Sequence, residues 1–110
     1  NVFRKYAKTH PVVLAGDFNS NPIFKESMTV DQEPTISFFL DAKEIGCASI
    51  DYYPVSKDMV ASTFPSDRPI EKLDYIFYTP EKIEKISFKV LEDFETASDH
   101  LPVMMEFKIK

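Results

Sequence analysis

The chain has 110 residues, of which 44% are hydrophobic and 14% aromatic, so it can bury the core of one globular domain. Its formal net charge of -5 at pH 7 argues against a protein that coats nucleic acid, but a nuclease stays possible because a bound divalent cation offsets acidic charge locally. The single cysteine, Cys47, excludes an internal disulfide. No apolar run is long enough for a bilayer, so we expect no transmembrane segment.

A helix and a strand are expected at the start of the chain. Residues 1–8 carry apolar side chains at helical spacing, and Pro11 disfavours helix at the residue before it. Residues 12–15 (Val-Val-Leu-Ala) are apolar on both faces. Such a strand is usually covered on two sides, as in a layered α/β fold.

Two further helices are expected before residue 47. Residues 19–22 (Asn-Ser-Asn-Pro) are typical of a turn and precede a possible short helix near residues 23–28. Residues 35–45 place apolar side chains at helical spacing. Gly46 follows directly and is the expected C-cap of that helix.

Four strands are expected in the remainder, and the alternation of apolar side chains is clearest in the last two. They cover residues 48–53, 73–78, 86–91 and 102–109, and the proline-containing loop 54–69 separates the first from the second. If the last three run up, down and up as neighbours, the first and third of them begin at the same edge.

Side chains that can carry chemistry lie at the strand ends of that edge. Asp74 lies at the beginning of one strand, and Asp99 and His100 precede another. If the strand over residues 12–17 runs in the opposite direction, its end brings Asp17 and Asn19 to the same edge. Strand ends hold side chains in more defined positions than mobile loops do.

The residue types at this edge suit one kind of chemistry. Asp74 needs a partner, because a carboxylate is disfavoured within a strand and costly to bury alone, and His100 can supply an imidazole that the carboxylate orients. Asp17 and Asp99 offer hard oxygen ligands or a proton acceptor. Asn19 can donate to a phosphate oxygen without adding negative charge. Carboxylates with an imidazole suit divalent-metal hydrolysis of phosphate esters.

Three motifs occur together in the order and at the spacing of a known family. They are residues 16–19 (Gly-Asp-Phe-Asn), 73–77 (Leu-Asp-Tyr-Ile-Phe) and 98–103 (Ser-Asp-His-Leu-Pro-Val). Together they resemble the endonuclease/exonuclease/phosphatase superfamily of metal-dependent phosphohydrolases. The segment 63–66 (Thr-Phe-Pro-Ser), which leads into the second motif, is similar to a branch that holds many bacterial metal-dependent hydrolases.

The resemblance implies an α/β fold, namely a two-sheet α/β sandwich of the DNase I-like kind with mostly antiparallel strands and flanking helices. Residues 1–110 match the C-terminal half of that single domain. The family's glutamate metal ligand lies in the N-terminal half, which no segment before Val12 can supply. The missing half is therefore an expected partner, and we expect residues 1–110 alone to be inactive.

The resemblance also implies hydrolysis of a phosphodiester or phosphomonoester with Mg²⁺ or Mn²⁺. Asp17 matches the aspartate that positions or deprotonates the attacking water and also lies in the metal site, and Asn19 matches the asparagine that contacts the scissile phosphate. Asp99 matches a metal-site aspartate, His100 the histidine near the phosphate, and Asp74 the aspartate that orients it. Either Asp17 or His100 is the general base, and we favour Asp17.

Arg68 and Lys72 lie upstream of Asp74 and are candidates for contact with an anionic substrate, Arg68 in particular. The substrate class stays open among nucleic acids, sphingolipids, inositol phosphates and nucleotides, with the acidic charge arguing against long duplex DNA.

Two other interpretations remain. The protein can be a binding or regulatory pseudoenzyme that keeps the fold, or a small autonomous α/β interaction domain whose acidic residues are structural. In the second case Asp74 bonds backbone amides, and residues 16–19 are only the turn after a strand.

Overall fold

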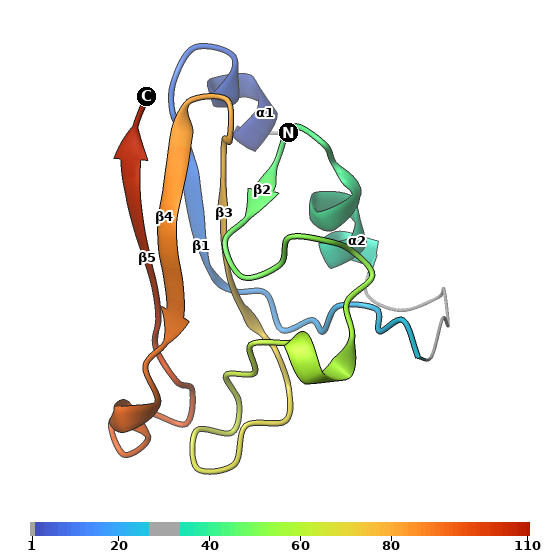
Figure 1. Cartoon of the computed structure of the whole chain (residues 1–110), viewed down its shortest axis with the longest axis vertical. Coiled ribbons are helices and arrows are strands. Elements are labelled where there is room, and N and C mark those ends of the chain that lie inside the picture. Colours follow the sequence, from blue (N-terminus) through green and yellow to red (C-terminus); the bar gives the residue numbers. More distant parts are fainter. Residues whose placement is uncertain (1, 27–33) are drawn as a thin grey trace.

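Strands form two antiparallel sheets in the computed structural model, which describes residues 2–26 and 34–110 (Figure 1). The first sheet has the order β1-β3-β2, and the second pairs β4 with β5. The strands are β1 (Val13–Asp17), β2 (Gly46–Cys47), β3 (Asp74–Tyr78), β4 (Ile83–Val90) and β5 (Val103–Ile109). The helices are α1 (Val2–Ala7), α2 (Pro34–Asp41) and two short 3-10 helices, η1 (Lys57–Met59) and η2 (Glu92–Phe94). The mixed α/β class with mostly antiparallel strands is confirmed.

β3 is the central strand of the first sheet, and its apolar middle is buried from Tyr75 to Phe77. β1 runs antiparallel to it, as predicted, with Val13 opposite Tyr78 and Asp17 opposite Asp74. The expectation that residues 12–15 are covered on both faces is wrong for the described chain, because Val12 and Leu14 pack against the core whereas Val13 and Ala15 are exposed. Val13 is 43% exposed.

Aromatic rings fill the space between β3 and α2. Phe39 of α2 stacks on Phe77 of β3 with 4.8 Å between ring centroids, and Tyr75 stacks on Phe77 at 5.5 Å. Phe18, just after β1, meets Phe77 edge-on at 5.3 Å. Offset and edge-on contacts of this kind stabilise a core beyond the area that they bury. The core therefore fixes the position of the residue between Asp17 and Asn19.

The helix expected over residues 35–45 is shorter, since α2 ends at Asp41. Gly46 is not its C-cap, and that prediction was wrong. The residue begins β2 with a negative φ, and a Cβ there would lie 2.7 Å from Cζ of Tyr78. Glycine is needed for this close approach and not for a helix end.

A strand over residues 48–53 was also wrongly predicted. β2 stops at Cys47, where the chain turns back so that the N–H of Ile50 donates to the Cys47 carbonyl at 3.3 Å. The possible helix near residues 23–28 lies partly outside the described residues. Within its described part, Phe24 forms an isolated parallel bridge with Val55 instead.

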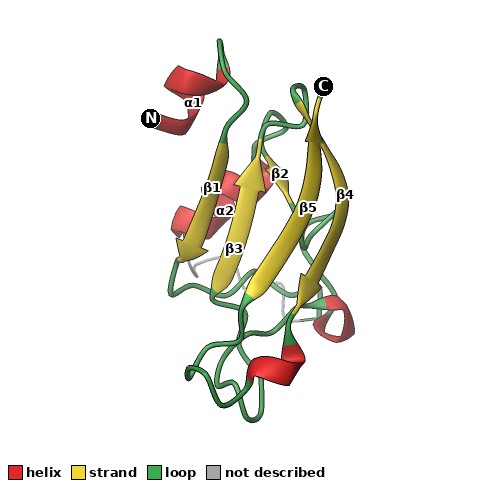
Figure 2. Ribbon diagram, turned by 90° about the vertical axis from the view of Figure 1, so that its left-hand side faces the viewer, coloured by secondary structure: helices red, strands yellow, loops and turns green. Residues whose placement is uncertain are grey.

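β4 and β5 confirm the last two predicted strands, but their order differs from the prediction. β4 pairs with β5, with a bulge between Lys85 and Ser87, and does not pair with β3. Figure 2 shows β5 beside β3, with both strands pointing the same way. The beginnings of β3 and β5 therefore lie at the end of the fold where β1 terminates, as expected. In the described part of the chain, no helix has the length and apolar character needed to span a bilayer.

Candidate active site

Three side chains meet at the end of the sheets where β1 stops and β3 and β5 begin. Nδ1 of His100 lies 2.8 Å from Oδ2 of Asp74, and Nε2 of His100 lies 3.8 Å from Oδ2 of Asp17. An ionised carboxylate only accepts hydrogen bonds, so Nδ1 carries the hydrogen. The expected convergence of these three residues is therefore present, and His100 partners Asp74.

The turn after β1 fixes Asp17 and Asn19. The N–H of Phe18 donates to the carbonyl of Leu73 at 2.8 Å, which continues the pairing of the two strands by one residue. The N–H of Asn19 then donates to Oδ1 of Asp17 at 2.8 Å. Asn19 has φ 51°, in the left-handed region that asparagine tolerates better than most residues. Both side chains are exposed to incoming molecules.

Asp74 is held more firmly than Asp17. Its side chain is 15% exposed, against 48% for Asp17. Oδ2 of Asp74 also accepts the hydroxyl of Thr63 at 2.6 Å, and the Nζ of Lys72 donates to the Asp74 main-chain carbonyl at 2.8 Å. The more buried carboxylate is therefore suited to orienting His100, and the more exposed one to meeting substrate or metal.

The loop before β5 presents the imidazole. The N–H of His100 donates to the hydroxyl of Ser98 at 3.2 Å, and the carbonyl of Asp99 accepts the N–H of Ser66 at 2.8 Å. On the other side, the ring of Phe64 lies 4.9 Å from the imidazole between centroids. These contacts leave the His100 side chain 26% exposed.

Charge around the imidazole changes its protonation. The hydrogen bond to Asp74 raises the pKa of His100 above its ordinary value, and the negative charges of Asp74, Asp17 and Asp99 add to this, while partial burial opposes it. The protonated form is thus favoured. Behind the site, burial lowers the pKa of Lys72 to about 8.

Two further predicted residues take different positions. Asp99 is exposed, its Oδ1 accepts the hydroxyl of Ser98 at 3.4 Å, and it does not join the cluster that Asp17, Asp74 and His100 form. Arg68 lies exposed in a turn, where its N–H donates to the carbonyl of Pro65 at 3.2 Å.

Lys72 does not reach toward a substrate, and that prediction was wrong. Its side chain is fully buried, with Nζ 4.4 Å from the centre of the Tyr75 ring. Thr63 and Phe64 were missed as neighbours of the cluster, although they lie in the segment that resembled the family. Both are loop residues, so no periodic pattern marked them.

The donor atoms fit a divalent cation. One ligand atom from each of Asp17, Asp74 and His100 lies within 4.8 Å of the others. Carboxylate oxygens suit Mg²⁺ and Mn²⁺, and Nε2 of His100 faces Asp17 and not Asp74. The cluster is therefore chemically compatible with the metal that the resemblance implies.

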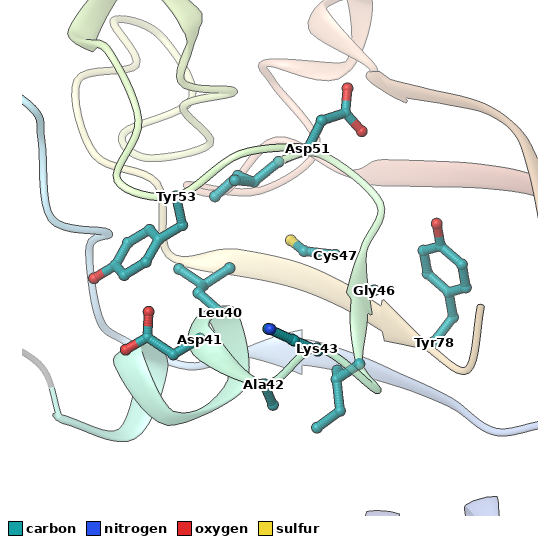
Figure 3. Close-up of a pocket in the computed structure, with 11 residues that line it drawn as sticks. Leu40, Asp41, Ala42, Lys43, Gly46, Cys47, Asp51, Tyr53 and Tyr78 are labelled. Carbon is teal, nitrogen blue, oxygen red and sulfur yellow. The ribbon is translucent and has the colours of Figure 1, made fainter. Parts of the chain in front are cut away.

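A separate hollow of about 270 Å³ lies between the end of α2 and β2 (Figure 3). Cys47, Tyr53 and Tyr78 are among the residues that line it, and none of Asp17, Asp74 and His100 does. The chemistry-bearing cluster and this hollow are thus distinct features.

Comparison with known proteins points the same way as the geometry. The profile of the endonuclease/exonuclease/phosphatase family matches residues 2–100. The crystal structure of an endonuclease/exonuclease/phosphatase from Bacteroides vulgatus is similar in fold, with a TM-score of 0.64 and 22% sequence identity. The match covers 99% of this chain but 41% of that one, so this chain spans about two fifths of its length. A search of curated proteins gave no match.

Proposed function

The chain belongs to the endonuclease/exonuclease/phosphatase family, and from that premise we propose that it contributes to divalent-metal-dependent hydrolysis of phosphodiester or phosphomonoester bonds. The observation that carries this proposal is the contact of His100 with Asp74, at 2.8 Å, within reach of the exposed Asp17. A merely structural histidine does not need a second carboxylate on its outer nitrogen.

In the proposed reaction each side chain has one task. Asp74 keeps the Nδ1 hydrogen of His100 in place, which leaves Nε2 to face the substrate. The raised pKa of His100 favours a proton on Nε2, where it can donate to a phosphate oxygen. Asp17 then accepts the proton of the attacking water, because a protonated His100 cannot. The amide of Asn19 donates to another phosphate oxygen.

Mg²⁺ or Mn²⁺ is the proposed cofactor. Its proposed carboxylate ligands in this chain are Asp17, which lies in the cluster, and Asp99, which lies outside it, whereas Asp74 and His100 keep the roles given above. When bound, such an ion neutralises charge on the phosphate and makes a bound water more acidic. Arg68 is proposed as a substrate contact, since the exposed guanidinium is free to approach an anion from the turn next to Phe64.

We further propose that the chain forms the C-terminal half of a larger domain. β1 is an edge strand, and an apolar hollow of about 410 Å³ lies between it and α1, lined by residues such as Phe3, Tyr6 and Val13. Exposed strand edges and apolar faces are sites of further pairing. An N-terminal half of the same domain is the proposed partner, and it would add the missing metal ligand.

The test compares residues 1–110 with the longest natural protein that contains them, using bis(4-nitrophenyl) phosphate with Mg²⁺, Mn²⁺ or EDTA. We expect turnover in the longer protein only, lost in EDTA, and reduced at least about 100-fold by Asp17→Asn and by His100→Gln. Asp93→Asn is the matched control, because Asp93 is an exposed aspartate of η2 outside the cluster.

Three results would contradict the proposals. Turnover that survives EDTA would contradict the proposed dependence on a divalent metal. Turnover that survives Asp17→Asn would contradict the assignment of the active site. Robust turnover by residues 1–110 alone, abolished by Asp17→Ala, would show that no second half is needed.

A further inference from the structure

Thr63 is a buried polar side chain directly behind the Asp74–His100 pair. Its relative exposure is 0%, and its hydroxyl donates to Oδ2 of Asp74 at 2.6 Å. The same Oδ2 accepts the hydrogen bond from Nδ1 of His100 at 2.8 Å. A buried hydroxyl is costly without a partner, and a bond to an ionised acceptor is about twice as strong as one between neutral groups.

The main chain of Thr63 joins the segments that form the site. Its N–H donates to the carbonyl of Glu71 at 2.8 Å, and its carbonyl accepts the N–H of Leu101 at 2.7 Å. Its hydroxyl oxygen also accepts the N–H of Leu73 at 3.4 Å. One residue thus contacts the beginning of β3 and the loop that carries His100.

The hydroxyl of Thr63 restricts the rotation of the Asp74 carboxylate, which the main-chain bonds of Thr63 do not do. The terminal torsion of an aspartate is broad and roughly two-fold, so one hydrogen bond to the imidazole leaves the carboxylate of Asp74 free to turn. A second donor on the same oxygen restricts that rotation. Oδ2 is therefore held toward His100 by Thr63 on one side and by Nδ1 on the other.

We propose that Thr63 is a positioning residue of the site: its hydroxyl fixes the carboxylate of Asp74, and Asp74 in turn fixes the ring of His100. The effect on turnover rests on the proposed function, whereas the effect on the ring does not. The role belongs to the hydroxyl and not to the bulk of the side chain.

Three variants separate the hydroxyl from general packing. Thr63→Val keeps the shape and the main-chain bonds but removes the donor, and Thr63→Ser keeps the donor. Thr79→Val is the matched control, because Thr79 is 3% exposed and its hydroxyl accepts the N–H of Val12 at 3.0 Å beyond the opposite end of β3. All three are made in a His10→Gln background, which leaves His100 as the one imidazole of residues 1–110.

The main readout is the nitrogen and Nδ1 proton NMR spectrum of His100 in the metal-free protein. We expect Thr63→Val to shift or broaden these signals, Thr63→Ser to restore them, and Thr79→Val to leave them unchanged even if it lowers stability. Unchanged signals in Thr63→Val would overturn the proposal, as would a Thr63→Ser spectrum that matches that of Thr63→Val.

Turnover of the longer natural protein is the second readout, with an expected loss of about 10- to 100-fold in Thr63→Val and recovery in Thr63→Ser. If the unaltered longer protein shows no metal-dependent turnover while the His100 signals respond as expected, the proposed function fails and the positioning role stands. If Thr63→Val does not fold, the unaltered protein decides: a slowly exchanging Thr63 hydroxyl proton supports the role, and its absence overturns it.

Discussion

Asp17 and Asp74 lie directly opposite one another in the antiparallel pairing of β1 and β3. Opposite residues of such a pair point to the same face, and like charges placed there are destabilising. The imidazole of His100 approaches both carboxylates, at 3.8 Å from Asp17 and 2.8 Å from Asp74. The strand ends thus bring two negative charges together at the point where a cation would be stabilised most.

The opposed carboxylates predict a conflict between stability and function. Above the pH at which His100 loses its proton, Asp17→Asn should raise the free energy of unfolding of the metal-free protein by up to about 1 kcal/mol, because it removes cross-strand repulsion. Urea denaturation measures this change, and Asp93→Asn should leave the free energy unchanged. A less stable Asp17→Asn protein at that pH would contradict the prediction.

The raised pKa of His100 predicts how stability changes with pH. A folded-state pKa above the unfolded value stabilises the fold fully below the unfolded value, about 6.5, and this contribution is lost as the pH rises through the folded pKa. Asp74→Asn should lower the pKa of His100, because the hydrogen bond to an ionised Asp74 is the largest cause of the shift. NMR titration in the His10→Gln background tests this. An unchanged pKa in Asp74→Asn would show that the pair does not control the imidazole.

Lys72 predicts the opposite trend at higher pH. Burial lowers its pKa from 10.5 to about 8, so the unfolded chain binds more protons between these values and the free energy of unfolding should rise with pH there. Lys72→Met should lack the rise, which we expect to be on the order of 2 kcal/mol. Urea denaturation between pH 8 and pH 10.5 measures both proteins, and parallel curves would contradict the assignment.

The two glycines predict opposite responses to the same substitution. Gly46→Ala places a Cβ 2.7 Å from the Tyr78 ring and should destabilise the protein by about 1–3 kcal/mol, with partial recovery when Tyr78→Val is added. Gly16→Ala meets nothing within 4 Å and should be neutral or stabilise by up to about 1 kcal/mol. Thermal unfolding of the two variants tests the contrast. Equal losses would mean that the Tyr78 contact is not the reason for Gly46.

Local patterns predicted much of the fold. The apolar run before Asp17 and the apolar, aromatic run after Asp74 identified β1 and β3, and the motif order placed His100 near both. The sequence did not predict that β4 pairs with β5 and not with β3, because alternation defines the faces of a strand but not its neighbour. The sequence predicts a helix end at Gly46 and not a close contact, since Tyr78 comes from a segment distant in the sequence.

The sequence also predicted only part of the candidate site. Carboxylates and imidazoles are recognisable as chemical groups, so Asp17, Asp74 and His100 were found. Thr63 was not, because a buried threonine in a loop gains its role only from what surrounds it. Lys72 was predicted to contact an anionic substrate since lysine is rarely buried, whereas here it is fully buried with its amine against the ring of Tyr75.

The division into two sheets has a consequence for how the candidate site is lost. In the described part of the chain, the aromatic core includes Phe77 and Tyr75 of β3 but no side chain of β4 or β5. Regions with fewer core contacts open at lower free energy than the core itself. If the β5 end opens first, His100 leaves Asp74 while the core stays intact, so heat or mild denaturant should break the His100–Asp74 contact before the aromatic core melts.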